Sequence, residues 1–279
     1  MRRIAHLSDL HFGRHDPVVV DGLLASLAAA RPDLVVVSGD LTQRARRAEF
    51  AAARAFLDRL APVPTVVIPG NHDIPLYDLA RRFVRPLHRF RRLIGCEAHA
   101  FFADAELAVL GLNTARSLTF KNGRISFEQM NRIRRAFSDV PSGALRVLAV
   151  HHPLAPPAHD PGLDPVGRWR PALEAIGHAG VQVVLSGHFH GAFSGGLALP
   201  ASPADGAGGC VLAVHAGTAV STRTRGGEAN SYNLIRTEAD LALTVAVQAW
   251  DGLRFAESRR TGFERRDGRW GRTAVEPGP

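Results

Sequence analysis

The sequence of 279 residues predicts an α/β fold in which two mixed β-sheets face each other and helices cover their outer sides. β-Branched apolar runs alternate with amphipathic segments over the first 190 residues, which is the pattern of repeated β-α-β units. Beyond residue 192 the pattern changes to that of antiparallel strands and hairpins. A chain that is 46% hydrophobic can bury one core of this size, so we expect a single domain.

The elements follow in order. We expect strands at 4–8, 34–38 and 65–69, with helices at 18–31 and 44–60 between them. The alternation continues with strands at 107–112, 145–150 and 181–186 and helices at 127–137 and 170–179. We then expect a Gly/Ala/Pro-rich loop at 191–209 and strands at 210–216, 231–237, 241–250 and 253–258. The predicted domain covers 1–272, and 273–279 is expected to be a flexible tail.

Five short polar motifs follow these strands. They read Asp9-Leu10-His11, Gly39-Asp40, Gly70-Asn71-His72-Asp73, His151-His152-Pro153 and Gly187-His188-Phe189-His190. Taken singly, each has an ordinary explanation, such as a turn or a helix cap. Together they predict loops that converge at the carboxyl ends of adjacent strands, where α/β sheets place their sites.

The residue types in these motifs indicate a metal centre. Carboxylate, imidazole and amide oxygen suit divalent Mn, Fe, Co or Zn, and no paired cysteines point to a thiolate zinc site. The potential ligands number seven, which is too many for one ion: Asp9, His11, Asp40, Asn71, His151, His188 and His190. Two ions that share a carboxylate about 3.5–4 Å apart would keep excess positive charge, hold a phosphate oxygen and activate a water. Such a centre suits phosphoester hydrolysis.

The order D-x-H, G-D, G-N-H-D, H-x-P and G-H-x-H resembles the calcineurin-like metallophosphoesterase superfamily. The resemblance implies an αββα sandwich and a phosphoric ester hydrolase. It further implies one metal on Asp9, His11, Asp40 and His190, a second on Asp40, Asn71, His151 and His188, and Asp40 as the bridge. His72 would be the catalytic histidine that assists the leaving group. His152 stays an alternative to His151, whereas we interpret His6, His15, His88, His99, His159, His178 and His215 as surface or core histidines.

The superfamily offers several activities. In length and motifs the chain is similar to bacterial class III cyclic-nucleotide phosphodiesterases, so we expect in-line attack of a metal-bridging hydroxide on a phosphodiester. The alternative is a phosphodiesterase or pyrophosphatase for a nucleotide-linked or lipid-linked substrate at a membrane surface. UDP-diacylglucosamine hydrolases of this kind carry Arg where His72 stands, which favours the diesterase. A metal-free interaction scaffold is a remote alternative, because the ligand set has no gap.

The net charge of +8 comes almost entirely from arginine, since Lys121 is the only lysine. Arginines are densest in 79–93, where apolar residues recur at helical spacing; an ordinary surface helix, a basic lid and a peripheral membrane contact all fit this segment. The expected partner of the site is a small anionic phosphoester. No nucleic-acid-binding motif is present. Asn113, Arg116 and Arg223 follow further strands and are weaker candidates for substrate binding.

Cys96 and Cys210 are the only cysteines, which gives no disulfide framework and favours a reducing compartment. We expect a cytoplasmic protein, because the N-terminal residues lead directly into a strand and no apolar run reaches about 18 residues.

Overall fold

A computed structural model describes residues 1–95, 100–156, 162, 164–200, 209–224, 227–238 and 242–273. Four sequence-based predictions concern residues outside these ranges. They are the reduced state of Cys96, the surface assignments of His99 and His159, and the flexible tail, of which 274–279 is not described. The thiol of Cys210 is free.

Seven strands form the first sheet, in the order β13-β12-β11-β10-β1-β2-β3. β1, β2 and β3 run parallel, whereas β10 to β13 add antiparallel strands to the other side of β1. The strands are β1 (Arg3–Leu7), β2 (Leu34–Ser38), β3 (Thr65–Ile68), β10 (Ser231–Thr237), β11 (Leu243–Trp250), β12 (Phe255–Arg266) and β13 (Arg269–Thr273).

Six strands form the second sheet, in the order β4-β5-β6-β7-β9-β8. Its four central strands, β5, β6, β7 and β9, are parallel, and β4 and β8 are antiparallel edges. The strands are β4 (Phe101–Ala103), β5 (Leu107–Leu112), β6 (Leu145–Val150), β7 (Val183–Ser186), β8 (Phe193–Ala198) and β9 (Cys210–His215).

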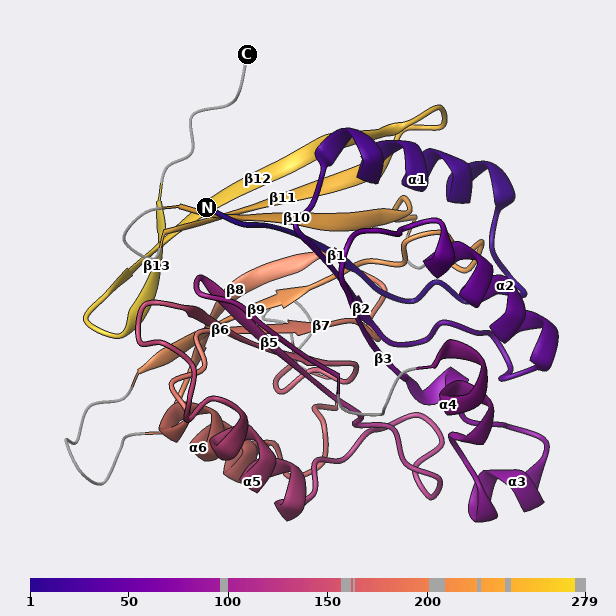
Figure 1. Cartoon of the computed structure of the whole chain (residues 1–279), viewed down its shortest axis with the longest axis horizontal. Helices are drawn as coiled ribbons and strands as arrows, with labels where there is room; N and C mark the ends of the chain where they lie inside the picture. The colour runs from indigo at the N-terminus through magenta and orange to yellow at the C-terminus, as the bar shows by residue number, and fades with distance from the viewer. Residues whose placement is uncertain are drawn as a thin grey trace.

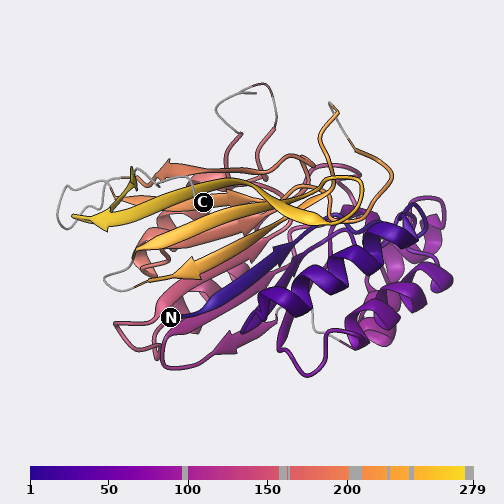
Figure 2. The same cartoon turned by 90° about the horizontal axis from the view of Figure 1, so that it is seen from above.

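The helices lie outside the two facing sheets, as Figures 1 and 2 show. They are α1 (Pro17–Ala30), α2 (Arg47–Asp58), α3 (Leu79–Val84), α4 (His88–Ile94), α5 (Phe127–Ala136), α6 (Trp169–His178) and the 3₁₀ turn η1 (Asn71–Asp73). Three apolar layers result: one under α1, α2 and α4, one between the sheets, and one under α5 and α6. The predicted αββα sandwich is confirmed, and its parallel strands all point towards one end of the molecule.

Residues at the element ends explain where several helices begin. The Asp16 carboxylate accepts a hydrogen bond from the Val18 amide, and Pro17 occupies the first turn of α1. Ser126 and Gln129 form a reciprocal capping box at α5. No helix of the described residues is long and apolar enough to cross a bilayer.

The structure corrects two predictions in the last third of the chain. The expected loop at 191–209 contains β8, which pairs antiparallel with β9 although Gly195 and Gly196 lie within it. The strand expected at 253–258 runs from Phe255 to Arg266, because 259–266 pairs with β11 and β13 and places Phe263 in the core between the sheets. The sequence pattern did not predict these strands, because neither alternates cleanly between apolar and polar residues.

The arginine-rich segment 79–93 is not one amphipathic helix. Pro86 separates α3 from α4, since proline cannot donate its backbone nitrogen and disfavours helix in the residue before it. The apolar residues of the predicted stripe therefore divide: Phe90 is buried in α4, whereas Leu79 and Phe83 are exposed on α3. Arg82 is buried rather than solvated.

Candidate metal centre

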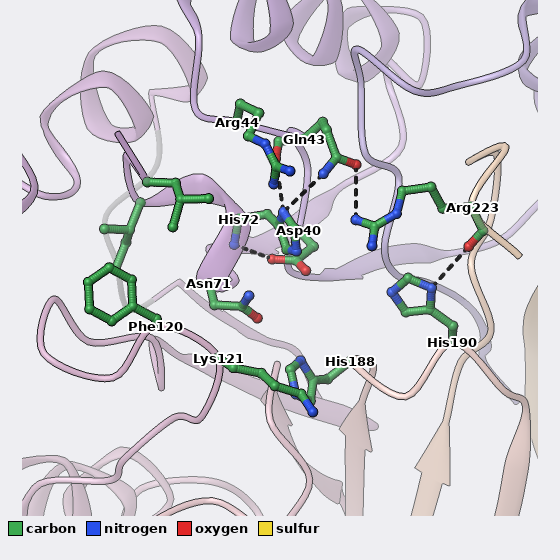
Figure 3. A pocket seen from close by; sticks show the side chains of 12 residues that line it. Asp40, Gln43, Arg44, Asn71, His72, Phe120, Lys121, His188, His190 and Arg223 are labelled. Carbon is green, nitrogen blue, oxygen red and sulfur yellow. Dashed lines mark hydrogen bonds between the residues drawn. The ribbon is translucent and has the colours of Figure 1, made fainter. Parts of the chain in front are cut away.

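The five polar motifs meet where the parallel strands of both sheets end. β1, β2 and β3 lead into the first three motifs, and β6 and β7 lead into the last two. Six of the seven candidate ligands are buried, and Asn71 is half-buried. Figure 3 shows part of this group around a pocket of about 270 Å³.

Asp9 is the centre of the first cluster. Its Oδ1 atom lies 3.6 Å from His11 Nε2 and 3.2 Å from His190 Nε2, and it is buried without a hydrogen bond. Its Oδ2 atom accepts a hydrogen bond of 3.0 Å from the His188 amide. A buried carboxylate oxygen that faces two imidazole nitrogens fits a cation-binding position, because a cation would compensate all three groups.

Asp40 belongs to both halves of the site. Its Oδ2 atom lies 3.3 Å from His151 Nε2 and 3.8 Å from His11 Nε2. His151 Nε2 is in turn 3.2 Å from the side-chain oxygen of Asn71. One carboxylate therefore stands between ligand candidates from β1 and ligand candidates from β3 and β6.

Backbone carbonyls fix the tautomers of two candidate ligands. His151 Nδ1 lies 2.8 Å from the Ser38 carbonyl oxygen, and His190 Nδ1 lies 3.2 Å from that of Arg223. A carbonyl can only accept, so each Nδ1 carries a hydrogen and each Nε2 is the nitrogen that faces the site. This arrangement is typical of metal-binding imidazoles.

The charges of the centre are strongly perturbed. Burial acts to raise the pKa values of Asp9 and Asp40, but the neighbouring imidazoles outweigh it and hold both well below their ordinary range. Burial acts to lower the pKa of His151, yet the Asp40 carboxylate raises it to about 9. Burial lowers the pKa of His188 to about 3. The two ionised carboxylates therefore stabilise positive charge in a buried site. Metal ions could supply this positive charge in place of a protonated histidine.

The backbone is bent into left-handed conformations at the motifs. Nine non-glycine residues in the described ranges have positive φ, and five of them are candidate ligands: Asp9, His11, Asp40, His188 and His190. Glycines allow the close approach of neighbouring loops. A Cβ atom at Gly70 would lie 2.2 Å from Asp40 Oδ1, and one at Gly187 would lie 2.5 Å from Asp9 Oδ2. Strain of this kind is concentrated at functional sites, where the surrounding fold holds it.

His72 stands beside the two clusters. Its amide donates to Asp40 Oδ1 at 2.8 Å, and its Nδ1 donates to the Gln43 carbonyl at 2.9 Å. Nε2 is therefore the nitrogen available for a proton transfer or a contact in the pocket, which His72 lines. Next to it, buried Asp73 accepts hydrogen bonds from Gly70 and Thr42 and so ties the loop after β3 to the loop after β2.

Comparison with known proteins assigns the family. The sequence profile of calcineurin-like phosphoesterases matches residues 2–192, which is more than half of the chain. The chain belongs to the calcineurin-like phosphoesterases. The protein is accordingly a metal-dependent phosphoester hydrolase, as the five motifs predicted.

Relatives of this phosphoesterase are named as phosphodiesterases. A probable cyclic nucleotide phosphodiesterase of Synechococcus is 26% identical over 70% of this chain and 76% of its own. A probable cyclic nucleotide phosphodiesterase of Rhodococcus erythropolis is 28% identical over 67% of this chain and 64% of its own. A glycerophosphodiester phosphodiesterase of Enterobacter lignolyticus is 35% identical over 30% of this chain and 33% of its own. This chain therefore spans less than two thirds of the Rhodococcus relative.

Solved structures share the fold. Purple acid phosphatase from yellow lupin aligns over 92% of this chain and 52% of its own, with a TM-score of 0.66 and 11% identity. A dimetal phosphatase from Danio rerio aligns over 92% and 98%, with a TM-score of 0.60 and 13% identity.

The structure distinguishes the two adjacent histidines of the phosphoesterase. His152 Nδ1 is 2.7 Å from Thr114 Oγ1, and its Nε2 is 3.0 Å from the Lys121 carbonyl oxygen. Both nitrogens are thus occupied, and burial holds the His152 pKa well below its ordinary value. His151 keeps one nitrogen for the site, so the geometry favours His151 as the ligand.

Of the three weaker substrate candidates, Arg223 alone lines the pocket. Asn113 Oδ1 accepts from the Ala115 amide, and the Arg116 guanidinium donates to the carbonyls of Asn113 and Ala115 and to Gln129. These contacts join the loop after β5 to α5 and lie outside the pocket wall.

Sequence reasoning missed several lining residues, namely Gln43, Arg44, Ile74, Leu76, Phe120 and Lys121. Gln43 and Arg44 could have been found from their position directly after the Gly39-Asp40 motif. Phe120 and Lys121 lie in the loop after β5 and carried no comparable signal.

Proposed function

We propose that the protein is a binuclear phosphodiesterase. The observation that carries the proposal is the position of Asp40 Oδ2, within 4 Å of both His11 Nε2 and His151 Nε2. A carboxylate between two imidazole groups is what a bridging ligand requires. Asp9, His11 and His190 would complete one metal site, and Asn71, His151 and His188 would complete the other.

Asp9 Oδ1 is buried without a hydrogen bond, and the Nε2 atoms of His151 and His190 face the site, which supports the fit of two divalent ions such as Mn, Fe or Zn. Such ions supply Lewis acidity and an activated water. The chain's own residues would do the rest: the ligands fix the geometry, and His72 Nε2 would give a proton to the departing oxygen or stabilise the phosphoryl charge.

A phosphodiester is the favoured substrate. Arg44, Lys121 and Arg223 bring positive charge to the pocket wall, which suits an anionic ester, while Ile74, Leu76 and Phe120 offer apolar surface to an organic group. The names of the Synechococcus and Rhodococcus relatives, both probable cyclic nucleotide phosphodiesterases, make a cyclic nucleotide the first substrate to test.

Metal analysis and a substrate screen test the proposal. We expect two metal ions per chain after loading with Mn²⁺, and hydrolysis of cyclic nucleotides or bis(p-nitrophenyl) phosphate faster than that of p-nitrophenyl phosphate or a nucleotide pyrophosphate. One ion per chain would contradict the binuclear centre. Preference for the monoester or the pyrophosphate would contradict the diester assignment.

A further inference from the structure

Exposed apolar side chains gather beside the pocket mouth. The described residues include eleven exposed large apolar side chains, and six of them lie on two neighbouring segments, 77–84 and 118–120. We call these six the rim face: Tyr77, Leu79, Phe83, Val84, Leu118 and Phe120, each more than half exposed. Phe120 also lines the pocket, so the rim face reaches the site itself. α3 and the loop after β5 come together on the same side of the molecule (Figure 1).

Arg82 holds the two segments together. Its side chain is buried, its Nε donates to the Ser117 carbonyl at 2.8 Å, and its Nη1 donates to the Pro75 carbonyl at 3.0 Å. The guanidinium also lies 4.0 Å from the centre of the Phe120 ring. A buried arginine therefore joins the two segments that carry the exposed apolar side chains of the rim face.

The charge around the rim face is positive. Arg81 and Arg85 lie on or next to α3, and Arg44 and Lys121 lie on the pocket side. The Arg44 guanidinium is 5.8 Å from the centre of the Tyr77 ring. Asp78 is the nearby acid, and it is paired with Arg81. The chemistry that complements this surface is therefore apolar at the centre and anionic around it.

We propose that the rim face docks the enzyme onto an anionic lipid bilayer. Aliphatic and aromatic side chains on a short helix and a loop can enter the acyl boundary, while arginines beside them meet the lipid phosphates. Such insertion needs no complementary groove. Docking would place the mouth of the pocket at the level of the lipid headgroups. The docking itself is independent of the proposed phosphodiesterase activity.

Co-sedimentation of the full chain with vesicles tests the proposal. We expect binding to vesicles of phosphatidylcholine mixed with phosphatidylglycerol, and weaker binding to phosphatidylcholine alone. The double variant Phe83→Ser/Leu118→Ser should bind the anionic vesicles at least about ten-fold more weakly, because less apolar area is inserted. The control Val18→Ser/Leu253→Ser removes apolar side chains elsewhere that are at least as exposed, and it should bind like the wild type.

Two charge variants test the electrostatic contribution to vesicle binding. Arg85→Gln should weaken binding at low salt and lose this difference at high salt, whereas Arg135→Gln on α5 should not change binding. Equal binding to neutral and anionic vesicles, or a double variant that binds like the wild type, would overturn the proposal. So would a dimer that the double variant dissociates, since the face would then join two copies.

Hydrolysis of bis(p-nitrophenyl) phosphate by the same variants reports the phosphodiesterase activity separately, and we expect it to be unchanged.

Discussion

The floor and the rim of the pocket are built in different ways. The floor consists of buried side chains at the ends of parallel strands, and several of these residues have left-handed backbone conformations. The rim of the pocket consists of Arg44, Phe120, Lys121 and Arg223, and it shares only Phe120 with the rim face described above. These four residues are half-buried or exposed and lie on loops. The floor is buried on all sides, whereas the rim is partly open to solvent.

This difference separates chemistry from selection. Groups that must meet within about 0.5 Å of a productive arrangement need rigid support, which strand ends and backbone hydrogen bonds give. Groups that choose a substrate or a surface can lie on loops and vary without loss of the fold. Substitutions in the floor should therefore act on turnover and metal content, and those in the rim on substrate affinity.

The largest effect is expected at Asp40. Asp40→Ala removes the carboxylate that both halves of the floor share, so metal content should fall at both positions and phosphodiester hydrolysis should drop to background. Metal analysis by mass spectrometry together with initial rates would check this. A variant that keeps full activity would show that the floor does not depend on Asp40.

His72 should act on turnover without affecting metal content. We expect His72→Ala to keep its metal ions and to lower kcat by about 10²–10⁴-fold, the usual contribution of an acid-base group. His152→Gln is the matched control, because it alters a neighbouring imidazole with no nitrogen left for the site. Loss of metal from His72→Ala would make His72 a ligand.

Beneath the floor, His6 should make stability depend on pH. Burial, and then the neighbouring His215, lower the pKa of His6 to about 3, although Asp9 acts to raise it. The unfolded chain takes up this proton near pH 6.5 and the folded chain does so only near 3, so stability is lost as pH falls across this window. Between pH 6.5 and 5 the free energy of unfolding should fall by about 2 kcal/mol more in the wild type than in His6→Gln. Urea unfolding of both proteins in a chelator would measure the difference, and parallel curves would contradict it.

The smallest effects are expected at the rim. Arg44→Gln or Arg223→Gln should lower kcat/KM by about ten-fold, chiefly through KM, because each removes a charged hydrogen-bond donor to the substrate anion. Added salt should reduce the difference from the wild type. Arg116→Gln is the control, since its guanidinium binds carbonyls and Gln129 outside the pocket; an equal loss in this variant would break the contrast between rim and interior.

The floor was predictable from the sequence because each ligand candidate directly follows an apolar strand. Parallel strands bring their carboxyl ends together, so a linear motif such as Gly39-Asp40 fixes a position in space. The bounds of β2, β5, β6 and β10 agree with prediction. β2, β5 and β6 are almost continuous apolar runs that are buried on both faces.

The rim and the antiparallel edges could not be predicted this way. Arg82 on α3 contacts the Ser117 carbonyl and the Phe120 ring, and no local sequence pattern indicates this long-range contact. β8 and β13 are partly exposed edge strands whose partners, not their composition, determine them. His151 and His152 differ in their hydrogen-bond partners: both ring nitrogens of His152 contact groups outside the site, whereas only Nδ1 of His151 does. Only the three-dimensional arrangement shows this difference.

The strand pairing has a consequence for the order of synthesis. β10 pairs with β1, which leads to Asp9, and β9 pairs with β7, which leads to His188, although both partners lie beyond the segment shared with the family. On the ribosome all the ligand residues emerge before the strands that support two of their loops. The nascent chain therefore carries exposed strand edges until β9 and β10 have been translated, and such edges are open to chaperone binding and to wrong pairing.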